Sequence, residues 1–181
     1  MKRGEELLRS SKPTYVLDAT PVIHFSKISR LNLILDICNA FVTKEVYNET
    51  VVRGEDFPES VAIKESVESG RLKVYEVKTE NRVKALLKYP EIHKGEAETI
   101  VAAEELGGTA IMDDKEARVI AKIYNVDTAS GCLFLLFRLF RLGKIDVNEA
   151  KSVLEELVNS GLRLDPETLL EAYRKIEQRD I

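Results

Sequence analysis

The sequence predicts an α/β protein with three layers, α/β/α, a parallel sheet and a helical C-terminal cap. Short apolar runs of strand formers alternate with helical patterns from Tyr15 to about Val126, and this alternation is typical of a parallel sheet covered on both faces. From about Ser130 onward, three helical patterns follow one another without a strand. The 181 residues fit one domain.

The first half of the chain is expected to contain three strands. Tyr15 to Asp18 is short, apolar and rich in strand formers, which indicates a buried strand. Thr20 followed by Pro21 predicts a helix start, with a hydroxyl cap and then proline in the first turn. The further elements expected here are a helix at 32–37, a strand at 40–42, a helix from its cap Thr43 to about Val52, a helix at 60–69 closed by Gly70, a strand at 72–77 and a helix at 81–88.

The second half is expected to contain two more strands and five helices. Gly107 and Gly108 end a helix that starts at Glu96. Asp146 with Glu149 three residues later has the pattern of a capping box. The expected elements are helices at 96–106, 115–124, 130–142, 147–159 and 166–178, a strand at 109–112 and a short strand near Val126. The helix SGCLFLLFRLFRLGK is so apolar that we expect partial burial together with a contact to a second copy of the chain.

Composition and charge narrow the classes of function. The formal net charge is −4, whereas nucleic-acid binders without catalysis usually have a basic balance. A protein of this charge that acts on RNA needs local basic patches or metal ions. No stretch approaches the ~20 apolar residues of a membrane span, and the N-terminus does not resemble a signal peptide. We therefore expect a cytoplasmic protein in which Cys38 and Cys132 are buried thiols.

Four acidic residues from distant segments are expected at one edge of the sheet. Ligands of open parallel sheets bind outside the carboxyl ends of the strands. Asp18 ends the first strand, Asp113 ends the fourth, and Glu96 lies in the first turn of a helix that starts at the same edge. Glu49 lies on the second turn of its own helix, roughly 9 Å along at ~1.5 Å rise per residue. The four converge if the first and fourth strands are neighbours.

Such a cluster of acids predicts a divalent metal. Like charges within a few ångströms repel and raise each other's pKa, and a hard cation compensates for this. Ligation by oxygen alone suits Mg²⁺ or Mn²⁺. A metal held in this way lowers the pKa of a bound water and stabilises charge on a phosphodiester, which is the chemistry of a nuclease without a protein nucleophile.

Each acid also has an ordinary structural interpretation. Asp18 could cap the next helix, although Thr20 is the better-placed cap. Asp113 could form a capping box with Glu116, or Asp114 could be the cap and leave Asp113 free.

The two glutamates in the first turns of the helix expected at 96–106 point in different directions. Glu96 and Glu98 are about 200° apart on a helix, so only one can face the site, and we expect Glu98 to face solvent. Glu45 and Glu49 share one helix face, and Glu45 also suits the positive end of the helix dipole. From the sequence alone, it remains undecided whether Glu49 is a site residue or an ordinary residue of its helix.

Four segments in this order resemble the PIN (PilT N-terminus) domain: YVLDATPVIHF, KEVYNETV, HKGEAETIVAA and AIMDDKEAR. They are most similar to the prokaryotic branch with a GEAE motif, which is related to VapC-type toxins. The resemblance covers about residues 14–164, with 1–13 as an N-terminal extension and 165–181 as a C-terminal helix packed on the same domain. It implies the strand order 3-2-1-4-5.

The resemblance also implies the chemistry. It gives Asp18, Glu49, Glu96 and Asp113 as the catalytic acids, and Asp18, Glu96, Asp113 and Asp114 as metal ligands for Mg²⁺ or Mn²⁺. It implies RNA as substrate, a homodimer and, in toxin members, a small antitoxin partner. Met112 stands where many PIN domains have asparagine, which leaves open whether Asp113 or Asp114 binds metal.

The function expected is therefore a metal-dependent endoribonuclease, with the toxin of a toxin–antitoxin pair as its specific form. The first alternative is a catalytically idle PIN-like scaffold in RNA processing or protein binding. The second is a metal-dependent phosphatase with two aspartates spaced by one residue. Thr20 occupies the second of those positions and disfavours it.

Overall fold

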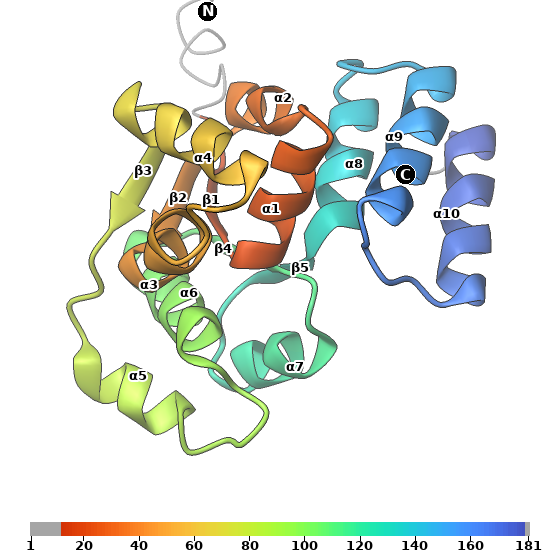
Figure 1. The fold of residues 1–181 in the computed structure, drawn as a ribbon. Helices are drawn as coiled ribbons and strands as arrows, with labels where there is room; N and C mark the ends of the chain where they lie inside the picture. Colours follow the sequence, from red (N-terminus) through yellow and green to blue (C-terminus); the bar gives the residue numbers. More distant parts are fainter. Residues whose placement is uncertain (1–11, 180–181) are drawn as a thin grey trace, which may run out of the picture.

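Five parallel strands form a single sheet in the order β3-β2-β1-β4-β5, in a computed structural model that describes residues 12–179 (Figure 1). The strands are β1 (Thr14–Leu17), β2 (Asn39–Thr43), β3 (Leu72–Tyr75), β4 (Thr109–Met112) and β5 (Thr128–Ser130). The central strand β1 pairs with β4, and Leu17 lies opposite Ile111. The first and fourth strands are therefore neighbours, which is the condition for the acids to converge.

Helices cover both faces of the sheet (Figure 1). One face is covered by α1 (Ala19–Lys27), α2 (Leu31–Ile37), α4 (Pro58–Glu68) and α8 (Gly131–Arg141), and α9 (Val147–Asn159) packs on α8. The other is covered by α5 (Glu80–Leu86), α6 (Lys94–Leu106) and α7 (Lys115–Ile123). The remaining helices are α3 (Lys44–Tyr47), the π-helix η1 (Asn48–Val52) and α10 (Pro166–Gln178). This arrangement confirms the three-layer α/β/α class.

The two central strands divide their side chains between two cores. Tyr15 and Leu17 pack in the core with α1, α2, α8 and α9. Val16 points to the opposite core with α5, α6 and α7, as do Ala110 and Met112 of β4. Successive side chains of a strand point to opposite faces, so a strand covered on both faces is apolar throughout, as the sequence of β1 indicates.

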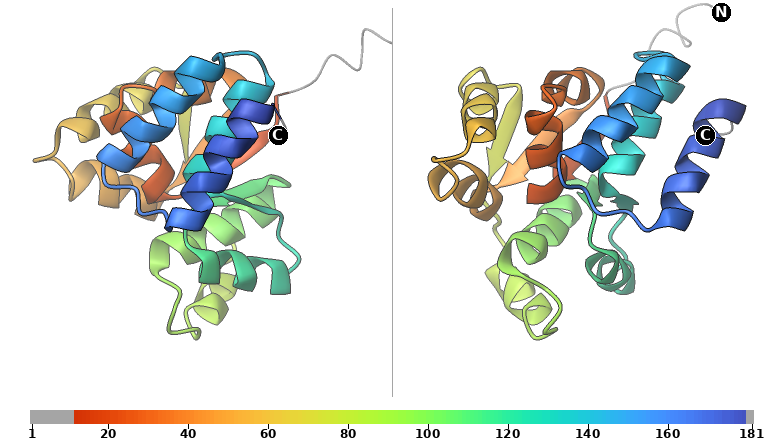
Figure 2. Two further views of the ribbon diagram at one scale, coloured as in Figure 1. Left: turned by 90° about the vertical axis from the view of Figure 1, so that its right-hand side faces the viewer. Right: turned by 45° about the vertical axis from the view of Figure 1, so that its right-hand side comes forward.

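The last three helices pack one on the next, with α8 against the sheet, α9 against α8 and α10 against α9 (Figure 2). The side chains of Leu135, Leu136 and Leu139 in α8 are fully buried, and Ala172 and Ile176 of α10 belong to the same core. Helix α8 is therefore a core helix. The contact with a second copy that its sequence led us to expect remains a prediction.

The expected cap at Thr20 was wrong. Helix α1 begins at Ala19, so Thr20 lies inside its first turn, and Asp18 occupies the cap position without a side-chain cap hydrogen bond. Pairing within the sheet determines where this helix begins. The Asp18 amide donates to the Ile111 carbonyl (3.0 Å), which extends the β1–β4 pairing directly up to the helix.

Two further local predictions need correction. The fifth strand begins at Thr128 rather than near Val126, because the Val126 amide donates to the Ala121 carbonyl (3.0 Å) and closes the end of α7. The expected helix after Thr43 does start there, since the Thr43 hydroxyl accepts from the Val46 amide (3.2 Å). After four residues, however, it continues as the π-helix η1.

Candidate active site

Asp18 follows β1 directly and is buried, with 7% of its surface exposed. Among residues 12–179 it is the only Asp, Glu, Lys, Arg or His that is buried. Burial raises the pKa of Asp18 from 3.8 to about 7, the Ala19 amide lowers it, and the charges of Glu96, Glu49 and Asp113 raise it further. The three other acids from distant segments therefore lie close enough to act on Asp18.

Asp113 follows β4, and its carboxylate lies against the start of α8. The Cys132 amide donates to Oδ1 (3.0 Å) and Oδ2 (3.2 Å), and the Cys132 thiol donates to Oδ2 (3.2 Å). On the backbone side, Arg118 Nη1 donates to the carbonyls of Met112 (2.8 Å) and Asp113 (2.7 Å). Both the main chain and the side chain of Asp113 are thus fixed.

Asp114 is the cap of helix α7. Its Oδ1 accepts a hydrogen bond from the Ala117 amide at 2.7 Å. Of the two adjacent aspartates, Asp114 therefore fills the capping role, and the carboxylate of Asp113 lies against α8 instead.

Glu49 lies on η1, where the helix widens into a π-turn. Such turns often occur at functional sites. A β-carbon added to Gly95 would lie 3.4 Å from Glu49 Oε2 and 3.8 Å from Asp18 Oδ1. The oxygens of two acids from different elements therefore flank the first turn of α6 at a residue without a side chain.

Glu96 lies in the first turn of α6, where its Oε2 accepts a hydrogen bond from the His93 amide (2.8 Å). Burial raises the pKa of Glu96, the His93 amide lowers it, and the charges of Asp114 and Glu49 raise it. The structure thus brings Glu96 into the same electrostatic group as Asp18, although one of its oxygens is engaged by the backbone.

The expectation that Glu98 faces solvent was wrong. Its side chain is only 14% exposed, and its Oε2 accepts from the Glu45 amide (3.1 Å) at the start of α3. Glu45 in turn binds Lys94 and Arg53, both at 2.7 Å, and these hydrogen bonds lower its pKa. This ionic network joins α6 to the start of α3 and to Arg53, the residue that follows η1.

The oxygen-only donor set suits a hard divalent cation. Within residues 12–179, no three His, Cys, Asp or Glu side chains are grouped as a ready metal cage. Mg²⁺, however, usually takes only one or two protein carboxylates and fills its other positions with water and phosphate oxygens. Asp18 and Glu49, which each have an oxygen within 4 Å of the position of a Gly95 β-carbon, are the candidates for these two carboxylates.

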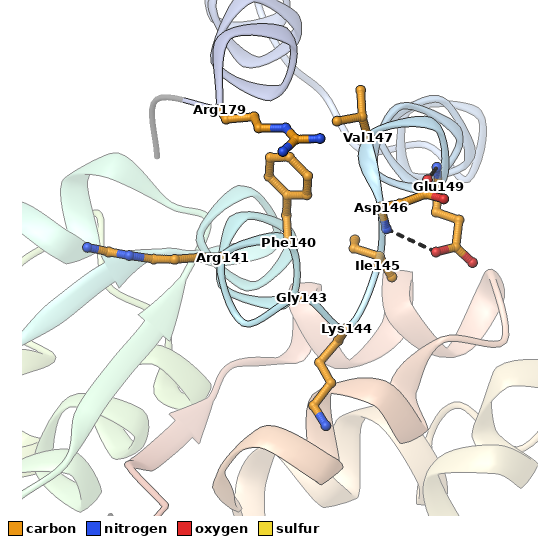
Figure 3. A pocket seen from close by; sticks show the side chains of 9 residues that line it. All are labelled: Phe140, Arg141, Gly143, Lys144, Ile145, Asp146, Val147, Glu149 and Arg179. Carbon is orange, nitrogen blue, oxygen red and sulfur yellow. Dashed lines mark hydrogen bonds between the residues drawn. The ribbon is translucent and has the colours of Figure 1, made fainter.

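A hollow of about 560 Å³ lies elsewhere, at the turn between α8 and α9. Figure 3 shows that its cationic side chains do not converge: Arg141 and Lys144 point away in different directions, and Arg179 lies beside the ring of Phe140. Its acids are engaged with the start of α9, where the Asp146 amide donates to the nearby glutamate (Figure 3). The hollow therefore lacks the features of a reaction site.

A family model described as a PIN domain matches residues 14–178. The chain belongs to the PIN-domain family. PIN domains are generally nucleases, and the strand order 3-2-1-4-5 that the resemblance implied is confirmed. No curated protein shows a significant match to the chain, and the relation to the VapC-type branch remains a prediction. In the part of this PIN domain that the structure describes, no helix is long and apolar enough to cross a membrane.

Sequence reasoning missed the residues that surround Asp113. Gly131 has a φ of +24° and lies under the Asp113 carboxyl group, and Cys132 donates to it. A glycine immediately after the fifth strand, in SGC, was the available signal.

Proposed function

We propose that this PIN domain is a divalent-metal-dependent endoribonuclease that hydrolyses RNA phosphodiesters. The observation that supports the proposal most is the buried carboxyl of Asp18, whose pKa is raised to about 7 by burial and by three neighbouring acids. Burying an acid among other acids costs stability. Strongly perturbed titratable groups of this kind concentrate at functional sites.

The proposed metal ligands are drawn from Asp18, Glu49, Glu96 and Asp113, and the proposed ion is Mg²⁺ or Mn²⁺. When bound, the ion would supply an acidified water and positive charge for the phosphodiester. Asp114 caps α7 through one oxygen, so its proposed contribution is negative charge beside Glu96 rather than direct ligation.

The side chains of the site have distinct proposed roles. Asp18, whose pKa is raised to about 7, would be fully deprotonated when a cation binds, since metal ligands must be deprotonated. Glu49 and Asp18 each have an oxygen within 4 Å of the position of a β-carbon on Gly95, so these two carboxylates would share one cation. The net charge of −4 is consistent with a site that accepts RNA only together with a cation.

RNA cleavage by the purified protein tests the proposal. End-labelled single-stranded RNA is incubated with wild type in Mg²⁺, in Mn²⁺ and in EDTA, and with Asp18→Asn in Mn²⁺. We expect cleavage with either metal, none in EDTA and none with the variant. Asp36→Asn is a matched control, because Asp36 is an exposed aspartate paired with Arg71. Undiminished cleavage by Asp18→Asn would exclude Asp18 from the mechanism.

A catalytically idle scaffold is the second candidate function. It is favoured by the engagement of Glu96 and Asp113 with backbone amides and by the lack of a three-residue metal cage within residues 12–179. This function predicts RNA or protein binding that is equal in Mn²⁺ and in EDTA, with no cleavage in either.

The specific biological form that we propose is a cytoplasmic toxin that acts as a homodimer and is silenced by a small antitoxin. Induced expression should then arrest growth with wild type and not with Asp18→Asn. Co-expression of a small open reading frame directly upstream of the gene should restore growth. Light scattering during gel filtration should give twice the monomer mass of 20.5 kDa.

A further inference from the structure

The junction between β5 and α8 forms a cradle under the carboxylate of Asp113, made of Gly131 and Cys132. Gly131 directly follows the last residue of β5 and is the first residue of α8. Gly131 is buried, and Cys132 is fully buried. Asp113 itself is half-buried, so its carboxylate has the cradle on one side and the region of Asp18 on another.

Gly131 is required by two independent constraints. Its φ of +24° lies in the region that L-residues with side chains rarely adopt. A β-carbon on Gly131 would overlap the carboxyl carbon and both oxygens of Asp113. Any side chain at position 131 would therefore displace the Asp113 carboxylate, even if the backbone tolerated the substitution.

Cys132 holds the same carboxylate with two donors. Its amide is shared between Oδ1 (3.0 Å) and Oδ2 (3.2 Å), and its thiol donates to Oδ2 (3.2 Å). An ionised carboxylate has about four acceptor positions, so acceptor positions remain for a further ligand. The start of a helix also favours negative charge.

The other buried cysteine gives a direct comparison. The Cys38 thiol donates to the Ile34 carbonyl in its own helix, at the same distance of 3.2 Å. That bond is local to α2 and touches none of the acids. The Cys132 bond instead joins residues 19 positions apart, from the ends of two neighbouring strands.

We propose that Gly131 and Cys132 are positioning residues, which orient Asp113 so that its free acceptor positions serve the site around Asp18. This inference rests on the proposed metal-dependent function and adds to it the residues that orient one of its acids. Partners that orient a metal ligand typically change metal affinity or activity by about 10- to 100-fold when they are removed.

Mn²⁺ affinity, measured by calorimetry or by the loss of the free-ion electron paramagnetic resonance signal, tests the proposal. Cys132→Ala should weaken Mn²⁺ binding by about 10- to 100-fold. Cys132→Ser should bind almost as well as wild type, because a hydroxyl also donates to Oδ2. Cys38→Ala, which loses a buried thiol bond of the same length, should leave the affinity unchanged.

A second measurement tests the contact without metal. In EDTA, Gly131→Ala should lower the melting temperature strongly in wild type and much less in an Asp113→Ala background, because the overlapping carboxylate is then absent. Gly143→Ala is the control for backbone strain, since Gly143 has a φ of +64° and open space around it. Its effect should be the same in both backgrounds.

The outcomes separate this inference from the proposed function. If wild type binds no Mn²⁺, the proposed function fails, and with it the role of the cradle in metal binding. If wild type binds Mn²⁺ but Cys132→Ala and Cys38→Ala both bind it equally well, the cradle is structural only and the inference is overturned. Equal effects of Gly131→Ala in the two backgrounds would overturn the contact itself.

Discussion

Replacing Asp18 by asparagine should stabilise the metal-free protein increasingly as the pH rises. Burial, above all, raises the folded-state pKa of Asp18 to about 7 from its ordinary 3.8. Between these values the folded carboxyl binds more protons than the unfolded one, so the wild-type free energy of unfolding falls as the pH rises from about 4 to 7. A shift of about three units at about 1.36 kcal/mol each gives about 4 kcal/mol. Asparagine does not titrate and has no such loss.

Urea unfolding of wild type and Asp18→Asn in EDTA, at intervals from pH 4 to pH 8, measures this effect. The difference between the two free energies of unfolding should widen by about 4 kcal/mol over this range. In thermal scans this corresponds to about 8 to 16 °C for a domain of this size. Hydrogen bonds of the asparagine amide are independent of pH, so the widening reports the carboxyl charge alone.

Asp165→Asn is a control of opposite sign. The hydroxyl and the amide of Thr168 lower the pKa of Asp165, so this aspartate contributes stability above its unfolded pKa that is lost as the pH falls. The free energy of unfolding of wild type should therefore fall relative to that of Asp165→Asn only as the pH is lowered below about 4, and the difference between the two should stay nearly constant from about pH 5 to pH 8. Parallel curves for wild type and Asp18→Asn would refute the reasoning, because Asp18 would then titrate alike in the folded and unfolded chain.

Three further results are expected. Mn²⁺ should raise the melting temperature strongly at pH 8 and little at pH 4.5, because protons compete with metal for the acids; equal shifts in scans at both pH values would contradict this. Glu96→Gln should reduce the Mn²⁺ shift. Glu98→Gln should preserve it and cost at most about 1 kcal/mol in urea unfolding, since glutamine can still accept from the Glu45 amide but lacks the charge that faces Lys94. Asp114→Ala should lower the free energy of unfolding by about 1 kcal/mol, because α7 loses its cap. The variant should still cleave RNA with Mn²⁺, and a loss of cleavage would show that Asp114 is a metal ligand after all.

The fold could be predicted because its elements depend on local patterns. The runs of apolar residues in β1 and β4 reflect burial on both faces. The capping box of Asp146 and Glu149, which is recognisable from three-residue spacing alone, is present at the start of α9. Thr20 failed as a cap because pairing between β1 and β4 decides where α1 begins. Such tertiary hydrogen bonds leave no trace in the residues next to the helix.

The candidate site could be predicted only as far as the positions of its acids. The strand ends place Asp18 and Asp113, and the first turn of α6 places Glu96. The π-turn of η1, which directs Glu49, has no simple sequence signature. The direction of Glu98 was misjudged because it depends on the packing of α3 against α6.

The pairing of β1 with β4 has a consequence for the order in which the molecule is made. A chain that has grown only to the end of α6 contains Asp18, Glu49 and Glu96, but not Asp113. Until β4 is added, β1 keeps one unpaired edge, and the cradle requires the still later junction of β5 and α8. A ribosome-bound fragment that ends before residue 113 therefore lacks the full acid set. With the proposed acid set, nuclease activity therefore requires that the chain has been synthesised beyond residue 113.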